Sequence, residues 1–242
     1  MAMKMYGEHR FPGRLFVVEG VDGSGKSTQL QLLKHWLDGE TYSAIESSWN
    51  SSKLVKDTTK KAKEKQLFTP ATFSMLHATD FADRMEREII PPLQAGSIVV
   101  CDRYIYTAFA RDCTRGCDPA WVRYLYRFAV KPTLTFYFRV PMDIAYKRIV
   151  GGRGQLKFYE AGMDMKYSPD IQESFQTFQT KIMEQYEQMV TEFDFVVIDA
   201  TLPVEEQQQQ VRQAVKKKLE DAKKVRVRRW LELSPTVRGY RD

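Results

Sequence analysis

Near the start of the chain lies an eight-residue run that fits the pattern G-x-x-x-x-G-K-[ST]: Gly20-Val21-Asp22-Gly23-Ser24-Gly25-Lys26-Ser27. Glycines at these places let backbone N–H groups wrap a chain of phosphates, and the helix that follows adds partial positive charge. The pattern predicts that Lys26 reaches the β- and γ-phosphates of a nucleoside triphosphate and that Ser27 holds Mg²⁺. The residues expected to contact this triphosphate, ATP, are Gly20, Asp22, Gly23, Ser24, Gly25, Lys26, Ser27 and Thr28.

Two oppositely charged residues, Asp102 and Arg103, follow a second apolar run. A carboxylate at such a position can bind Mg²⁺, and a guanidinium can bracket phosphate oxygens. Two further arginines, Arg148 and Arg153, border a glycine-rich stretch. We expect Lys26, Arg103, Arg148 and Arg153 to be the catalytic cations, and residues 149–169 to form a mobile lid that excludes water.

Short apolar runs alternate with amphipathic stretches along the chain. The strands are expected at 15–19, 42–46, 97–101, 133–138 and 194–198, and the helices at 26–38, 52–65, 70–94, 103–130, 142–151, 168–191 and 203–222. Pro91-Pro92 should kink or end the third helix, and Gly151-Gly152-Arg153-Gly154 should not continue the fifth. Such alternation predicts an α/β fold of three layers, with a five-stranded parallel sheet between helices. Ligands bind beyond the carboxyl ends of such strands.

The composition fits one large domain, expected over residues 14–222, followed by a basic tail at 223–242. Of the 242 residues, 43% are hydrophobic, and no apolar run is long enough to span a membrane. Three cysteines make no even disulfide framework, which favours a reducing cytoplasm. Residues 216–242 carry ten basic and four acidic side chains, and this excess equals the whole net charge of +6. Because the rest of the chain is balanced, nucleic acid is the less favoured partner.

Four stretches make the chain resemble the thymidylate kinases, a family of nucleoside-monophosphate kinases with a phosphate-binding loop. They are residues 18–28, Ala82-Asp83-Arg84, Asp102-Arg103-Tyr104 and Ile198-Asp199-Ala200-Thr201, and the likeness covers about residues 14–215. The resemblance implies transfer of the γ-phosphoryl group of ATP to dTMP, giving dTDP. It also implies Mg²⁺ as cofactor and a homodimer.

Roles for single residues follow from the same resemblance. Asp22 is expected near the sugar and phosphate of the acceptor, Arg84 over its base and Arg103 on its phosphate, while Ala200 is expected beside the adenine of ATP. The expected acceptor contacts are Asp22, Trp49, Phe81, Arg84, Arg103, Thr107 and Arg111.

The chain departs from the family around the acceptor. Where the family has Arg-Glu-Pro-Gly after the second strand, this chain has Glu46-Ser47-Ser48-Trp49. Asp80 takes the place of the aromatic residue that stacks on the base, for which Phe81 or Trp49 is the expected substitute. The donor half of the site is therefore intact, and the identity of the acceptor is open.

Two other functions compete with this interpretation. Glu46 and Trp49 also resemble the deoxynucleoside kinases, in which a Glu at the end of the second strand acts as general base on a sugar hydroxyl. In the third hypothesis, the chain is a nucleotide-gated protein that binds nucleic acid through its basic tail. The sequence favours the monophosphate kinase over both.

Overall fold

Five parallel strands form one sheet in the computed structural model, which describes residue 7 and residues 9–233, with the backbone alone for residues 153 and 221–233. The order across the sheet is β2-β3-β1-β4-β5. The strands are β1 (Arg14–Glu19), β2 (Ala44–Ser48), β3 (Ile98–Asp102), β4 (Leu134–Arg139) and β5 (Val196–Asp199). Central strand β1 is almost wholly buried because Leu15, Phe16, Val17 and Val18 are covered on both faces. The expected fold class is confirmed.

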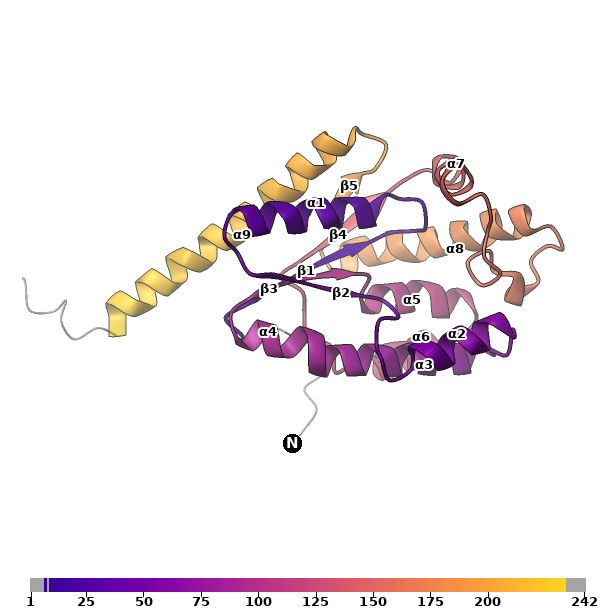
Figure 1. The fold of residues 1–242 in the computed structure, drawn as a ribbon, viewed down its shortest axis with the longest axis horizontal. Coiled ribbons are helices and arrows are strands. Elements are labelled where there is room, and N and C mark those ends of the chain that lie inside the picture. The colour runs from indigo at the N-terminus through magenta and orange to yellow at the C-terminus, as the bar shows by residue number, and fades with distance from the viewer. Residues whose placement is uncertain (1–6, 8, 234–242) are drawn as a thin grey trace, which may run out of the picture.

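Helices cover both faces of the sheet (Figure 1), so the chain forms three layers. The helices are α1 (Lys26–Gly39), α2 (Lys56–Glu64), α3 (Pro70–Arg84), α4 (Ile90–Gln94), α5 (Ile105–Thr114), α6 (Pro119–Leu125), α7 (Met142–Arg153), α8 (Ile171–Glu192) and α9 (Val204–Leu233). In Figure 1, α1 and α9 lie on one side of the sheet, while α3, α4 and α5 lie on the other. The carboxyl ends of β1, β3 and β2 lie next to one another at one edge of the sheet. Asp102, the last residue of β3, pairs with Val18 of β1 on one side and with Ser48 of β2 on the other.

The helix expected over residues 103–130 is two helices, α5 and α6. Gly116 has a φ of 88°, a left-handed conformation that ends helices, and its N–H bonds the carbonyl of Cys113 at 2.9 Å. Asp118 then caps α6, accepting from the N–H of Trp121 at 2.7 Å, and Pro119 occupies the first turn. A glycine C-cap and an Asp-Pro start, both readable in the sequence, separate the two helices.

Two other helix boundaries also differ from the expectation. The helical path expected over 70–94 is continuous, but it passes from α3 to α4 through a π-helical turn at Met85–Ile89. Pro91 and Pro92 directly follow this π-helical turn and lie in the first turn of α4, so they do not end the path. Helix α7 includes Gly151 and Gly152 and ends at Arg153, where Gly154, with a φ of 71°, caps it.

Strand β2 is shifted by two residues from its expected position of 42–46. Ser47 and Ser48, not Glu46, therefore form its carboxyl end. At the other end of the chain, α9 continues from Val204 through Leu233 without a break at residue 222. Residues 234–242 of the expected tail lie outside the described residues. None of the described helices is both long and apolar enough to cross a membrane.

Candidate active site

The glycine loop joins β1 to α1 and places Lys26 at the first position of the helix. Gly23 and Gly25 have φ values of 81° and 85°, and a Cβ on Gly23 would lie 2.3 Å from the carbonyl oxygen of Ala145. Only glycine fits this close approach. Lys26 is buried and donates to the carbonyl of Val21 at 3.3 Å, so its ammonium lies inside the curve of the loop. Burial, helped by the nearby Arg103, lowers the pKa of Lys26.

Ser27 and Asp102, the residues expected to hold the metal, lie side by side. The hydroxyl of Ser27 donates to Oδ2 of Asp102 at 2.7 Å, across the junction of α1 and β3. The other oxygen of Asp102, Oδ1, is buried and has no hydrogen-bond partner. An unpartnered carboxylate oxygen beside a serine hydroxyl fits Mg²⁺, which takes one or two protein ligands together with water and substrate phosphates.

Arg103 connects the end of β3 to the glycine loop. It has a φ of 69°, which turns the chain directly after β3. Its guanidinium forms an ion pair with Asp22 and donates to the carbonyl of Gly20 and the hydroxyl of Thr107, both at 3.4 Å. Arg103 thus contacts the glycine loop, a pairing that the sequence analysis does not predict, and Asp22 balances its charge.

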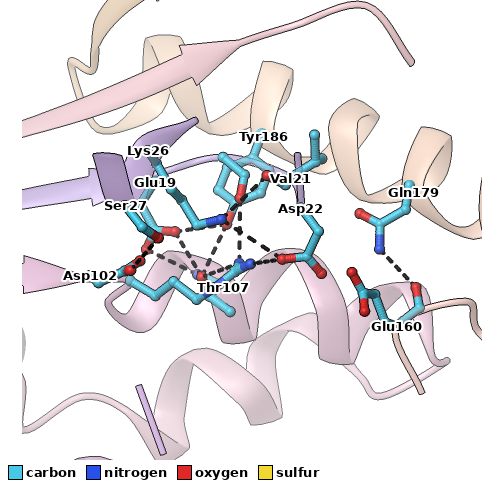
Figure 2. Close-up of polar contacts among 12 residues, drawn as sticks. Glu19, Val21, Asp22, Lys26, Ser27, Asp102, Thr107, Glu160, Gln179 and Tyr186 are labelled. Atoms are coloured by element: carbon cyan, nitrogen blue, oxygen red, sulfur yellow. Dashed lines mark hydrogen bonds and ion pairs between the residues drawn. The ribbon is translucent and has the colours of Figure 1, made fainter. Parts of the chain in front are cut away.

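A buried carboxylate, that of Glu19, connects the elements around Arg103 through hydrogen bonds (Figure 2). It accepts hydrogen bonds from the main-chain N–H of Tyr104, from the hydroxyl of Thr107 and from the hydroxyl of Tyr186, each at 2.7 Å. Burial raises the pKa of Glu19, while these hydrogen bonds and Arg103 oppose that shift. The network ties β1, α5 and α8 together beneath the loop and fixes the backbone that carries Arg103.

A cavity of about 520 Å³ extends from the glycine loop toward α2, α3 and α5. Asp22, Lys26, Ser27, Asp102, Arg103 and Thr107 line its loop end. Trp49, Lys63, Phe73, Arg111, Lys157 and Tyr159 line the far end. Of the expected acceptor contacts, Trp49, Thr107 and Arg111 thus reach the cavity together with Asp22 and Arg103.

Phe81 and Arg84 do not reach the cavity, contrary to the expectation. Both side chains are 0% exposed. The guanidinium of Arg84 lies beneath Trp49, with Cζ 5.8 Å from the indole centroid, and Nε donates to the hydroxyl of Ser47 at 3.0 Å. Phe81 packs against the other side of the same cluster, with its ring centroid 6.0 Å from that of Trp49. Trp49 covers both residues, so neither can touch a base.

Asp80, at the position of the family's stacking aromatic, holds the turn after β2. Its carboxylate accepts from the main-chain N–H groups of Asn50 at 3.1 Å and Ser52 at 2.9 Å. Burial raises the pKa of Asp80, and these two bonds oppose the shift. The turn in this conformation places Trp49 against the cavity, which explains how the chain keeps an aromatic surface there without the family's residue.

Glu46 lies outside the cavity. It is in the middle of β2, and its carboxylate accepts from Gln31 at 2.8 Å and from Ser48 at 3.1 Å. The expectation that Glu46 ends the second strand, on which its role as general base depends, is therefore wrong.

The donor side of the loop contains Arg148 and Ala200. Nη2 of Arg148 donates to the carbonyl of Ala200 at 2.9 Å, and Nη1 lies 4.0 Å from where a Cβ on Gly25 would be. Arg148, on α7, therefore reaches both the glycine loop and the segment that follows β5. Exposed Thr28, on the first turn of α1, does not line the cavity. The backbone of Arg153 ends α7, and its side chain lies outside the described atoms.

The expected lid packs against the body. Tyr159 and Ala161 are buried, and the hydroxyl of Ser174 on α8 donates to the carbonyl of Ala161 at 2.7 Å. The hydroxyl of Tyr159 accepts from the main-chain N–H of Phe68 at 3.3 Å. The segment thus closes the far end of the cavity in this structure.

Sequence reasoning missed five residues of this site: Glu19, Lys63, Phe73, Lys157 and Tyr186. Phe73 and Lys63 meet at the cavity wall, where the Nζ of Lys63 lies over the ring, 5.4 Å from its centroid. Glu19 is a charged residue at the end of an otherwise apolar strand, a signal that could have identified it. Lys63, Phe73 and Tyr186 come from helices, and Lys157 comes from the lid; no motif distinguishes any of the four.

The comparisons with known proteins agree with this geometry. The model of the thymidylate kinase family matches residues 18–211. A probable thymidylate kinase 2 of Saccharolobus solfataricus is 44% identical over 201 residues, which cover 83% of this chain and 94% of that protein. A probable thymidylate kinase of Pyrobaculum aerophilum is 30% identical, over 83% of this chain and 95% of that protein. A probable thymidylate kinase of Thermococcus kodakarensis is 34% identical, over 55% of this chain and 69% of that protein. The chain belongs to the thymidylate kinase family.

Proposed function

We propose that this chain transfers the γ-phosphoryl group of ATP to dTMP, giving dTDP. One observation carries the proposal: a single cavity joins Lys26 and Arg103 at the phosphate loop to Trp49 and Arg111 at its far end. A nucleoside monophosphate placed in it has its phosphate beside the loop and its base against an aromatic surface. The family membership and the names of the relatives support the same reaction.

A phosphate acceptor suits the groups present, because it needs no general base. The second pKa of a phosphomonoester is near 6, so the acceptor is already ionised at pH 7. The site must instead align two anions and neutralise the charge between them. In this proposal Lys26 binds the γ-phosphate, Arg103 binds the acceptor phosphate, and Asp22 holds Arg103 in place until that phosphate arrives.

Mg²⁺ is the proposed cofactor, held by Ser27 and Asp102. When bound it would neutralise charge on the β- and γ-phosphates. Arg148, beside Gly25 and Ala200, is placed to act on the donor side, near the adenine and the phosphate chain. Closure of the lid over the far end excludes water, which suppresses hydrolysis of ATP. The resemblance to the family further implies a homodimer, which light scattering on the purified protein can test.

The proposal is tested by supplying ATP and Mg²⁺ with a panel of thymidine, dTMP, dUMP, dCMP, dAMP and dGMP, and by measuring the nucleotides formed. We expect dTDP from dTMP and little turnover of thymidine. Lys26→Ala, purified identically, controls for contaminating kinases and should abolish the signal. Turnover of thymidine equal to that of dTMP would overturn the assignment of the acceptor.

A further inference from the structure

The residue that aligns with the family's base-binding arginine cannot serve that purpose here. Arg84 is fully buried, lies beneath Trp49 and is turned toward Ser47 on β2. Asp80, four residues earlier, is also buried and holds the turn at Asn50 and Ser52. The part of the site that recognises the base in the family is therefore occupied by a closed structural cluster in this chain.

Another arginine stands where the base would lie. Arg111 lies on α5 four residues beyond Thr107, slightly more than one turn or about 6 Å along the helix axis, and both residues line the cavity. Arg103, which precedes α5, lines the same wall. Arg103, Thr107 and Arg111 thus form a row that runs from the phosphate loop to the far end of the cavity. An acceptor phosphate at Arg103 brings the base to Arg111.

The guanidinium of Arg111 packs against two aromatic rings and is incompletely satisfied by hydrogen bonds. Its Cζ lies 4.8 Å from the ring centroid of Phe73 and 5.8 Å from that of Trp49. Nε lies 3.6 Å from Oδ1 of Asp112, and neither Nε nor Nη2 has a hydrogen-bond partner. Both nitrogens are closed off from solvent, and Arg84 has two such nitrogens as well. Access to the cavity sets Arg111 apart, because its side chain is 17% exposed and lines the cavity, where a ligand that accepts hydrogen bonds can meet it.

The surroundings of Arg111 favour a ligand that accepts hydrogen bonds. Lys63 and Lys157, which as ammonium groups only donate, line the same end of the cavity. The carboxylates of the cavity are mostly engaged elsewhere: Asp22 with Arg103, Asp102 with Ser27, and Glu64, largely exposed, with Lys60. Glu160 lies on the lid beside Gln179, which donates to its main-chain carbonyl (Figure 2).

We propose that Arg111, and not the aligned Arg84, determines which base the acceptor carries, by donating a hydrogen bond to a ring carbonyl oxygen. This inference rests on the proposed function. The site then takes 4-oxopyrimidine nucleotides, those of thymine and uracil, in preference to 4-aminopyrimidine nucleotides. Cytosine presents an amino donor in place of the O4 acceptor and leaves the guanidinium unpaired. A site that relies on one such bond rejects the mismatched ligand because the donor that faces the base then has no acceptor.

The experiment compares the binding of dTMP, dUMP and dCMP by calorimetry, without ATP, to the wild type, Arg111→Gln and Arg84→Met. We expect the wild type to bind dTMP and dUMP at least about tenfold more tightly than dCMP. Arg111→Gln offers an amide that both donates and accepts, so the preference should fall to about twofold or less. Arg84→Met should keep the wild-type preference. Circular dichroism melting of each variant shows whether it is folded.

The outcomes separate this inference from the proposed function. A wild type that binds dTMP and dCMP equally, or an Arg111→Gln variant that keeps the full preference, overturns the inference, even where dTMP is phosphorylated. Loss of the preference in Arg84→Met alone also overturns it. If Arg84→Met does not fold, Arg111→Lys replaces it as second variant: it keeps the charge and loses the planar fork, so an intermediate preference is expected. Absence of dTDP formation by the wild type rejects the proposed function instead.

Discussion

Arg115, directly after α5, donates through Nε to Oδ2 of Asp164 at 2.7 Å, and thereby ties the lid to the body. Its Nη2 donates to the main-chain carbonyl of Tyr159, also at 2.7 Å. The Arg115 side chain is 0% exposed, and its Cζ lies 4.5 Å from the ring centroid of Phe73 and 4.6 Å from that of Phe178. One residue therefore joins the lid, α3, α5 and α8 at the closed end of the cavity.

Replacing this arginine should loosen the lid and destabilise the fold. Arg115→Met leaves the carboxylate of Asp164, whose side chain is only 12% exposed, without its cation. Loss of one partner of a buried pair typically costs about 3–5 kcal/mol. We expect a loss of this order in urea unfolding, together with faster proteolysis within residues 154–169.

Arg139→Met is the matched control. Arg139 forms a two-bond pair with Glu187, but both side chains are more than two-fifths exposed. Exposed pairs contribute about 1 kcal/mol or less. Equal losses of stability in the two variants, or unchanged proteolysis of Arg115→Met, would show that Arg115 does not hold the lid.

The sequence was sufficient to predict which residues meet around the glycine loop. The glycine loop, Asp102 and Arg103 follow buried strands whose apolar runs are unambiguous, and backbone geometry alone brings those strand ends together. Lys26, Ser27 and Asp102 are accordingly found side by side. Local motifs predict the positions of these residues because each lies at or shortly after the end of a strand that the sequence identifies.

The acceptor half could not be predicted in the same way, since it depends on tertiary packing. Because β2 lies two residues later than expected, Glu46 is inside the strand and Trp49, directly after it, lines the cavity. Whether Arg84 faces the base or the core depends on Trp49 and Ser47, which are distant in sequence. Lys63 and Lys157 come from α2 and the lid, and no spacing rule relates them to Arg111.

Removal of the Glu46 carboxylate should have little effect on catalysis. Its oxygens already accept hydrogen bonds from Gln31 and Ser48, and it does not line the cavity. We expect Glu46→Gln to lower kcat with dTMP by less than about threefold, whereas the loss of a general base costs about 10²–10⁴. Steady-state kinetics of the variant with dTMP distinguish a small loss of kcat from the large loss expected for a general base. A drop of 10² or more would restore the deoxynucleoside kinase hypothesis.

Asp102→Asn should weaken the use of Mg²⁺. The amide keeps the shape of the side chain and can still accept from Ser27, but it lacks the charge that attracts the cation. Outer-shell and ligand changes of this kind typically cost about 10–100-fold in metal affinity or activity. We expect the Mg²⁺ concentration at half-maximal rate to rise by this factor, while exposed Asp38→Asn on α1 leaves it unchanged. An unaltered Mg²⁺ dependence would exclude Asp102 from the metal site.

Binding of dTMP should drive protonation of Lys63. Burial, with repulsion from Arg111, Arg115 and Lys157 and a smaller opposing effect of Asp80, lowers the pKa of Lys63 to about 7. At pH 8 roughly nine-tenths of this amine is therefore neutral in the free protein. A bound dianion adds negative charge among these cations, so it favours the ammonium form and raises the pKa of Lys63. The phosphate itself is already ionised at pH 8 and takes up no proton.

Calorimetry of dTMP binding at pH 8, in two buffers of different ionisation enthalpy, measures this uptake. We expect a fraction of a proton to be taken up by the wild type and by Lys61→Met, which changes an exposed lysine of the same helix α2. Lys63→Met should take up none. At pH 6 the uptake attributable to Lys63 should vanish as well, because the amine is then protonated in both the free and the bound protein. Uptake that persists undiminished in Lys63→Met would assign the proton to a different group and remove Lys63 from the acceptor site.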